Sequence, residues 1–229
     1  MQAIANLNRR RLPMPIGVAI LLGVTGGLWQ AYSGHAAMDT PPPAMAHTAA
    51  PQVWARAVAP AMNLYQMSPT LYRSALPTAQ DAAVVKALGI RTVVSFIKDD
   101  DRQWAKDPTM RLISLPMHAD RVTDDEVLEA LRVVKAAQAQ GPVLMHCKHG
   151  NNRTGIVAAM YRTVVEGWPR EAALAEMQHN GFGTDTEMAE AARYVRQADI
   201  TAIGQAFTQG SACVRSGSLC AIKRWVGVR

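Results

Sequence analysis

Several features that identify other classes of protein are missing from this chain of 229 residues. Outside the loop described below, its six histidines and three cysteines show no metal-ligand spacing, so we expect neither a metal nor another cofactor. Lys and Arg do not cluster among aromatic residues, and we therefore expect no nucleic-acid partner. No segment repeats with a period of about 20 to 50 residues, which excludes a solenoid.

The composition of the chain suits one folded domain with short extensions. Hydrophobic residues make up 49% of the chain and charged residues 18%, which allows a sizeable core. The formal net charge of +6 falls to +3 without the first 36 residues, because 21 basic then face 18 acidic residues. This mild excess supports only a modest attraction for anionic substrates.

The N-terminus has the organisation of an export signal. Residues 1–36 contain no acidic residue, and arginines at 9–11 precede an uncharged run over residues 12–29. Gly34-His35-Ala36 then places small residues at the two positions that a signal peptidase inspects. We predict a signal peptide over 1–36. An uncleaved inner-membrane anchor is the alternative, because the run is at the short limit for a membrane span.

Three further segments follow the predicted signal. Residues 37–57 are rich in proline and alanine and show no helical or strand period, which predicts a linker. Residues 58–205 have the pattern of a folded domain, and residues 206–229 form a C-terminal tail. Because an oxidising compartment favours pairing of cysteines, we expect a disulfide between Cys213 and Cys220, with two unpaired thiols as the alternative. Cys147 is then a single thiol and a candidate reactive group.

Strands and helices alternate along the folded domain. Short apolar runs predict strands over 71–74, 91–97, 112–115 and 142–146. Helical periods and capping residues, including the capping box of Thr123 and Glu126, predict helices over 79–88, 123–140, 154–166, 169–178 and 186–203. The polar segment 98–108, with Asp99-Asp100-Asp101-Arg102, is interpreted as a solvated loop. The alternation predicts an α/β fold whose central, mostly parallel sheet is flanked by helices.

One segment joins a predicted strand to a predicted helix and carries the chemistry: His146-Cys147-Lys148-His149-Gly150-Asn151-Asn152-Arg153-Thr154-Gly155. Backbone N–H groups and the positive end of the helix converge on one cavity there, and Gly150 permits close approach to a ligand. Arg153 can hold two phosphate oxygens with its planar guanidinium. The same field favours the thiolate form of Cys147, to which Thr154 can donate a hydrogen bond. His146 is expected to orient the loop through a backbone hydrogen bond.

This string of ten residues resembles the signature of the protein tyrosine phosphatase superfamily. Removal of 36 residues leaves 229 − 36 = 193 residues, a length similar to that of the compact dual-specificity branch. Leu71-Tyr72-Arg73-Ser74-Ala75-Leu76-Pro77 resembles the motif that begins the domain in that branch. Residues 92–102, 118–122 and 167–183 resemble the corresponding stretches of its bacterial periplasmic members.

The resemblance implies a dual-specificity-phosphatase-like fold with a strand–phosphate loop–helix active site and a metal-free mechanism through a phosphocysteine. It implies hydrolysis of phosphotyrosine in proteins of the periplasm, with phosphoserine and phosphothreonine as further substrates. By resemblance alone, the phosphotyrosyl partner would be an inner-membrane signalling protein, such as a cyclic-di-GMP-making enzyme that governs biofilm formation. Lys148 and His149 would face outward at the mouth of the pocket, and Asn151 and Asn152 would complete the loop.

The mechanism requires an acid that protonates the leaving phenoxide, and the candidates are Asp120, Asp124 and Asp125. Asp124 and Asp125 fall in the first turn of the capped helix, where the helix dipole alone favours acids. We prefer Asp120, which lies in the loop before the cap. Its separation from Cys147, 147 − 120 = 27, is shorter than is usual in compact members and implies a shortened loop.

Two other functions stay open on the sequence. An inositol-polyphosphate or phosphoinositide phosphatase could use the same loop, and Lys148 beside the cysteine resembles such enzymes. Their second lysine is absent, since Asn151 and Asn152 occupy the later positions. A non-catalytic phosphate-binding module is disfavoured by the intact Cys147, Arg153 and Thr154. Arg73 and Ser74 are interpreted as supporting residues rather than as contacts to substrate.

Overall fold

The computed structural model describes residues 52–118, 120–215 and 220. The predicted signal peptide over 1–36, and the linker as far as residue 51, therefore lie outside the described residues. The helices that are described are all too short or too polar to cross a bilayer.

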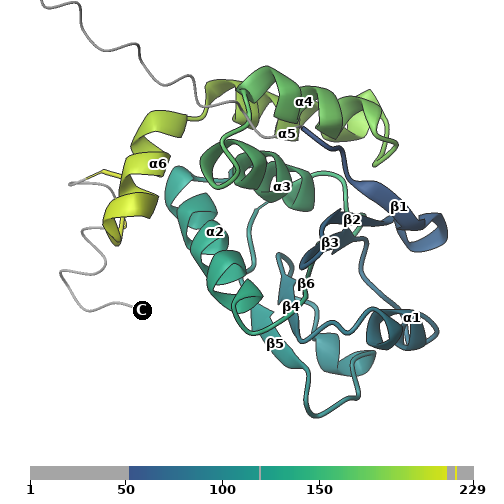
Figure 1. Cartoon of the computed structure of the whole chain (residues 1–229). Coiled ribbons are helices and arrows are strands. Elements are labelled where there is room, and N and C mark those ends of the chain that lie inside the picture. The colour runs from purple at the N-terminus through teal and green to yellow at the C-terminus, as the bar shows by residue number, and fades with distance from the viewer. Residues whose placement is uncertain (1–51, 119, 216–219, 221–229) are drawn as a thin grey trace, which may run out of the picture. The chain divides into compact units, whose positions relative to one another are not determined.

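The described residues form strands and helices in an order close to the predicted one (Figure 1). The strands are β1 (Arg56–Ala59), β2 (Leu64–Ser68), β3 (Leu71–Ser74), β4 (Thr92–Ser95), β5 (Arg111–Ser114) and β6 (Val143–His146). The helices are α1 (Ala82–Ala87), α2 (Asp124–Gln138), α3 (Arg153–Val164), α4 (Arg170–His179), α5 (Asp185–Gln197) and α6 (Ile200–Gln209). Two short 3-10 helices are η1 (Pro60–Met62) and η2 (Asp101–Gln103).

The strands form one mixed sheet in the order β1-β2-β3-β6-β4-β5. The strands β3, β6, β4 and β5 run parallel, which confirms the predicted α/β fold. The strands β1, β2 and β3 are joined as antiparallel neighbours, an edge that the sequence analysis missed. His146 pairs with both Ser74 and Ser95, so the chain leaves β6 between the carboxyl ends of its two neighbours. Ligands bind at this edge in open α/β sheets.

Alternate residues of the central strands face two separate apolar clusters, as the pleat of a strand requires. Val143 and Met145 of β6 face the larger cluster, which includes buried residues of α2, α3, α4, α5 and α6. Leu144 faces the smaller cluster, with Val85 of α1 and Trp104. Figure 1 accordingly shows α1 across the sheet from α3. The central strand is thus buried on both faces, which makes the start of the following loop rigid.

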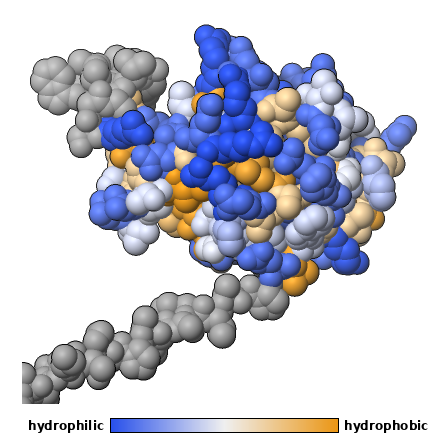
Figure 2. Space-filling model, turned by 90° about the horizontal axis from the view of Figure 1, so that it is seen from above, coloured by the Kyte–Doolittle hydropathy of each residue, from blue (hydrophilic) through white to orange (hydrophobic). Residues whose placement is uncertain are grey.

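Over the larger cluster, α3 is buried along most of its length, whereas α5 is amphipathic. In α5 the buried residues are Met188, Ala191, Ala192 and Val195, a spacing that places them on one side of a helix. At the surface, Figure 2 shows hydrophilic side chains over most of the face seen, around a smaller hydrophobic area. The capping box of Thr123 and Glu126 is present at the start of α2, as predicted.

Three local predictions differ from the structure. The helix predicted over 186–203 is two helices, because the chain turns at Ala198 and the Asp199 carboxylate accepts a hydrogen bond from Ala202 N to begin α6. The helix predicted over 79–88 is shorter, since α1 spans Ala82–Ala87, and the Thr78 hydroxyl before it donates to the Asp81 carboxylate. The strand β1 begins at Arg56, inside the segment 37–57 that the sequence predicts as a linker. Strands of four or five residues are too short to show a reliable period.

The described part of the C-terminal tail is attached to the helical side. A disulfide joins Cys213 to Cys220, with the two Cα atoms 5.9 Å apart. Val214 N donates to the Asp125 carboxylate at 2.7 Å, and Arg215 pairs with Asp199 at 3.1 Å. The bridged segment therefore contacts the first turn of α2.

Candidate active site

Cys147 lies at the carboxyl edge of the sheet, directly after β6 and six residues before the start of α3 at Arg153. Its side chain is free and almost fully buried, with 1% exposed. Because β6 is the central strand and α3 packs over it, the loop between them is held at both ends. The loop thus has the strand–loop–helix arrangement in which helix N-termini bind anions.

Gly150 allows this loop to pass close to the end of β3. Its φ is +78°, and a Cβ at this position would lie 2.6 Å from the backbone nitrogen of Ala75 and the carbonyl carbon of Ser74. Any other residue would be both strained and in collision with backbone. A hydrogen bond also joins the two segments, since Leu76 N donates to the Lys148 carbonyl at 3.2 Å.

Two side chains donate hydrogen bonds to carbonyl groups of the loop. The Asn63 amide donates to His149 O at 2.9 Å and to Phe182 O at 2.8 Å. Arg73 Nη2 donates to Gly150 O at 2.6 Å. Neither tie was predicted from the sequence, although Arg73 was interpreted as a supporting residue and its position agrees with that. A loop whose carbonyls are fixed outward is free to direct N–H groups inward.

The first turn of α3 carries polar donors that have no partner. Arg153 Nε and Thr154 Oγ1 are buried, and within the described part of the chain no hydrogen-bonding group contacts them. Buried donors are normally satisfied, so their pairing with a ligand is the simplest explanation. Both lie at the positive end of a helix, where an anion such as phosphate fits.

A buried acid lies beneath the loop. His146 is fully buried, and its Nε2 lies 3.0 Å from the Asp101 carboxylate, which also accepts a hydrogen bond from the Trp104 indole at 3.0 Å. His146 Nδ1 lies 3.4 Å from the Cys147 carbonyl, so Asp101 is its main partner. The interpretation of the segment 98–108 as a solvated loop was therefore wrong at Asp101, which is 5% exposed. The signal that could have revealed this was Trp104, whose indole requires a buried acceptor.

Lys148 and His149 are the exposed side chains of the loop, whereas Gly150 and Asn151 are buried. Asn151 Oδ1 accepts a hydrogen bond from Asn152 N at 2.8 Å, which braces the turn before α3. The exposed positions of Lys148 and His149 agree with the prediction that both face outward, and Lys148 adds a positive charge there.

Asp120 lies beside α3 but is held weakly. Its side chain is 70% exposed, and its contacts with His118 Nδ1 and Arg121 Nε are both 3.9 Å long. It lines a cavity of about 190 Å³ together with Ile156 of α3 and Tyr194 of α5. Ile156 follows Arg153 by three residues on the helix, so this cavity borders the first turn of α3.

Asp124 and Asp125, in contrast, are already engaged. The Tyr194 hydroxyl donates to Asp124 Oδ1 at 2.8 Å, and Val214 N donates to Asp125 Oδ1 at 2.7 Å. Burial and the neighbouring Asp124 carboxylate raise the pKa of Tyr194. The two acids thus fasten α2 to α5 and to the tail, whereas Asp120 is the one of the three candidates that accepts no hydrogen bond from the described residues.

Comparison with known proteins shows which family has this sequence pattern. The sequence matches the model of the tyrosine phosphatase family over residues 58–206. It is 56% identical over 183 residues to the dual specificity protein phosphatase TpbA of Pseudomonas aeruginosa, a match that spans 79% of this chain and 84% of that protein. A crystal structure of a cysteine-to-serine variant of P. aeruginosa TpbA in complex with phosphotyrosine is 60% identical. It covers 69% of this chain and 97% of that chain, with a TM-score of 0.67.

More distant proteins are similar over smaller parts of the chain. An inositol diphosphatase of Oryza sativa subsp. japonica is 27% identical over 134 residues, 55% of this chain and 65% of that protein. The core catalytic domain of a PP-IP phosphatase from S. cerevisiae is 18% identical, with a TM-score of 0.56 over 66% of this chain and 93% of that chain. At such identity the likeness shows a common fold.

Proposed function

Because the chain belongs to the tyrosine phosphatase family, we propose that it is a dual specificity protein phosphatase that hydrolyses phosphotyrosine through a phosphocysteine. Phosphoserine and phosphothreonine would be further substrates. One observation carries the proposal. The buried Cys147 begins a loop that leads into α3, and the first turn of α3 holds two buried donors without a partner in the described residues, Arg153 Nε and Thr154 Oγ1. The phosphotyrosine bound to the P. aeruginosa relative supports the same substrate class.

In the first step, the Cys147 thiolate attacks phosphorus, and the S–P bond forms as the P–O bond to tyrosine breaks. The Asp120 carboxyl gives its proton to the leaving phenoxide. Arg153 and the backbone N–H groups of the loop stabilise the charge that develops on the phosphoryl oxygens. Asp120 is exposed and held only by long contacts, so its side chain can turn toward the leaving group.

In the second step, water attacks the phosphorus of the phosphocysteine, and the Asp120 carboxylate takes a proton from that water. The S–P bond breaks, inorganic phosphate leaves, and the electron pair returns to the Cys147 sulfur. A hydrogen bond from the Thr154 hydroxyl stabilises the returning thiolate, and this hydroxyl is buried without another partner in the described residues.

The second candidate function is an inositol-polyphosphate or phosphoinositide phosphatase. It is favoured by the exposed Lys148 beside Cys147 and by the similarity to a plant inositol diphosphatase. Asn151 and Asn152 stand where such enzymes have a second lysine, which favours the protein substrate.

A substrate panel separates the two candidates. The purified protein is assayed with a phosphotyrosyl peptide, the matching phosphoseryl peptide and an inositol polyphosphate, with Cys147→Ser as the blank. We expect kcat/KM for the phosphotyrosyl peptide to exceed that for the inositol polyphosphate by about tenfold or more. The opposite order would establish the second candidate, and no turnover of any of them would contradict both.

The natural substrate is proposed to be the exported part of an inner-membrane signalling protein, such as a cyclic-di-GMP-making enzyme, and the compartment to be the periplasm. Residues 1–36 support export by their sequence. A fusion of residues 1–40 to a reporter that is active only outside the cytoplasm should therefore be active. A trapping pull-down from periplasm with Cys147→Ser should recover the substrate, and loss of the captured protein on addition of free phosphotyrosine would show that the active site holds it.

A further inference from the structure

The cavity that Asp120 lines adjoins the place that a substrate must occupy. In the proposed reaction the phosphoryl group lies against the first turn of α3, and its leaving oxygen comes within reach of Asp120. The cavity is lined by Asp120 and by Ile156, which lies three residues beyond Arg153 on α3. A side chain next to the phosphotyrosine of a protein substrate is therefore the group that can enter it.

The size and the polar lining of the cavity suit a single side chain. Its volume is about 190 Å³, below the roughly 300–1,000 Å³ of sites that hold drug-sized ligands. Besides Asp120, its polar lining consists of exposed residues of α5, which are Glu190, Arg193 and Gln197. Steps of three and four residues place these three on one face of the helix. The cavity is thus bordered by a charged face of α5.

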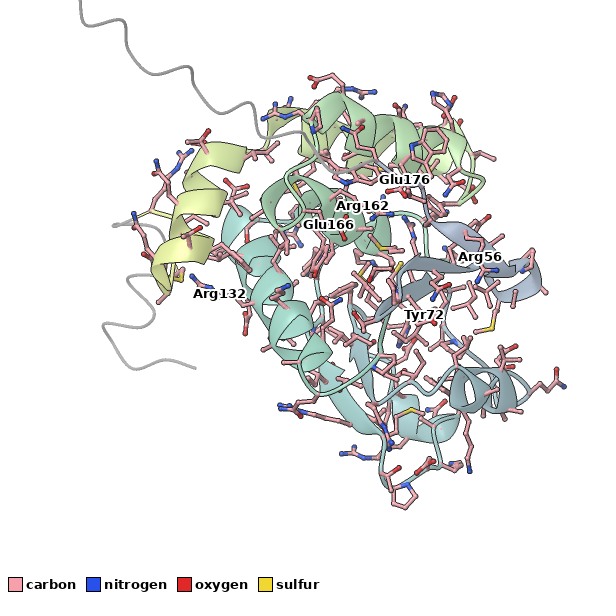
Figure 3. The ribbon with its side chains drawn as sticks, viewed as in Figure 1. Arg56, Tyr72, Arg132, Arg162, Glu166 and Glu176 are labelled. Atoms are coloured by element: carbon pink, nitrogen blue, oxygen red, sulfur yellow. A yellow bond between two sulfur atoms is a disulfide. The ribbon has the colours of Figure 1, made fainter. Side chains whose placement is uncertain are left out.

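The ion pair between Arg193 and Glu190 differs from the buried pair that joins α3 to α4. Figure 3 shows Arg162 between Glu166 and Glu176, and the side chains of Arg162 and Glu176 are only 3% and 4% exposed. Loss of one partner from a buried pair leaves an uncompensated charge and is strongly destabilising. The side chains of Arg193 and Glu190 are 58% and 51% exposed, and such surface pairs contribute little to stability. Arg193 can therefore exchange Glu190 for a carboxylate of a ligand.

The role proposed for Asp120 determines which kind of side chain suits the cavity. In the first step Asp120 must hold a proton. A carboxylate nearby favours that protonated form, whereas an ammonium group favours the ionised form, which cannot donate a proton. Arg121 Nε, 3.9 Å from the Asp120 carboxylate, also favours the ionised form, and an incoming carboxylate offsets it. An acidic side chain in the cavity is thus attracted by Arg193 and keeps the acid able to donate.

We propose that Arg193 is a specificity-determining residue of the phosphatase. It binds the carboxylate of an acidic residue adjacent to the phosphotyrosine, and this carboxylate takes the place of Glu190. The substrate class is then a protein segment in which an aspartate or a glutamate directly precedes or follows the phosphorylated tyrosine. The inference rests on the proposed phosphatase and deepens it, because it concerns which phosphotyrosine is chosen and leaves the chemistry at Cys147 unchanged.

The test uses phosphotyrosyl peptides that differ at one position. Glutamate or lysine is placed directly before the phosphotyrosine in one pair of peptides and directly after it in another, and kcat/KM of the purified protein is measured for each. On at least one side we expect the glutamate peptide to exceed the lysine peptide by about tenfold at low ionic strength, and by less at high salt. Equal values on both sides, or a preference for lysine, would overturn the proposal.

Arg193→Gln should reduce that preference to about twofold or less, whereas Arg193→Lys, which keeps the charge, should retain most of it. The matched control is Arg196→Gln. Arg196 is also an exposed arginine of α5, but it does not line the cavity, so the same change of net charge should leave the preference intact. Glu190→Gln removes the competing carboxylate and should raise kcat/KM for the glutamate peptide a few-fold. Equal losses of preference in Arg193→Gln and Arg196→Gln would show a general effect of charge and contradict the assignment to the cavity.

Nitrophenyl phosphate separates failure of this inference from failure of the proposed phosphatase, because it has no flanking residue. Hydrolysis of nitrophenyl phosphate and of all the peptides, without any dependence on glutamate or lysine, would overturn the role of Arg193 alone. Hydrolysis of none of them would contradict the phosphatase itself, and this inference with it.

Discussion

The two loops that carry the proposed chemistry differ in how firmly they are held. In the Cys147 loop, three successive carbonyl groups, those of Lys148, His149 and Gly150, accept hydrogen bonds from Leu76, Asn63 and Arg73. In the other loop, the Asp120 side chain is 70% exposed, and its contacts with His118 Nδ1 and Arg121 Nε are both 3.9 Å long. The residue proposed as nucleophile is thus held by several hydrogen bonds to its loop, and the residue proposed as acid is not.

The difference fits the tasks that we propose for the two groups. A phosphate-binding loop stabilises the transition state best when its donors need no reorganisation. The acid must reach two successive positions, the leaving oxygen and then the attacking water, and loops that move between such positions have few buried contacts. Substitutions in the Cys147 loop should therefore have larger effects than substitutions in the loop that carries Asp120, and changes in the tail that contacts α2 the smallest.

The largest effect is expected for Cys147→Ser. A serine hydroxyl is not ionised in this site, so turnover of a nitrophenyl phosphate should fall by several powers of ten. Inorganic phosphate should still bind, as isothermal titration can measure, because the ties to the loop carbonyls do not involve the sulfur. A variant that retained more than about a hundredth of the wild-type rate would contradict covalent catalysis.

Arg153→Lys should be the next most damaging change. The ammonium keeps the charge but cannot hold two phosphate oxygens at once, and kcat/KM should fall by about 10²–10³. The control is Lys148→Ala at the exposed rim, where loss of a charge should raise KM only a few-fold. Similar losses in the two variants would show that charge alone matters and that the rigid geometry does not.

Asp120→Asn should show a smaller effect that depends on the leaving group. Hydrolysis of phenyl phosphates with poor leaving groups should slow much more than that of nitrophenyl phosphate, because a stable anion needs little proton donation. The alkaline side of the pH–rate profile should also flatten, since deprotonation of the acid no longer limits the rate. Steady-state kinetics over a series of aryl phosphates at several pH values measures both.

The controls for Asp120 are Asp124→Asn and Asp125→Asn. Both residues lie in the first turn of α2. The Asp124 carboxylate accepts a hydrogen bond from the Tyr194 hydroxyl, and the Asp125 carboxylate accepts one from Val214 N. We expect them to lower the free energy of unfolding by about 0.3–1 kcal/mol through the helix dipole, with little change in rate. Leaving-group dependence in either of these variants, and none in Asp120→Asn, would place the acid on the helix instead.

The smallest effect is expected when Cys213 and Cys220 are both changed to serine. The bridge closes a short loop, because the two cysteines are seven positions apart. Its loss should lie at the low end of the usual range of roughly 0–5 kcal/mol. The measurement is denaturant unfolding of both forms, and kcat should stay within about twofold. A large loss of kcat would mean that the tail positions the loop that carries Asp120.

The sequence by itself determined the residues and spacing of the phosphate-binding loop, the fold class and the capped start of α2. These features are local, since a cap, a helical period or a strand–loop–helix string involves residues within one or two turns of each other. The strand predicted over 71–74 and the capping box of Thr123 and Glu126 are found where they were expected. The division into α5 and α6 was not predicted, because α6 is amphipathic and continues the apolar pattern of α5.

Only the tertiary structure decided which residues hold that loop. Asp101 meets His146 across 45 positions, Arg73 meets Gly150 across 77, and Asn63 meets His149 across 86. Arg73 lies near the end of β3, Asn63 directly follows η1 and Asp101 begins η2, and at each of these places the local sequence is equally suited to solvent. They converge because β3, β6 and β4 are parallel neighbours whose carboxyl ends share one edge. Strand order is a property of the packed sheet, and no local pattern encodes it.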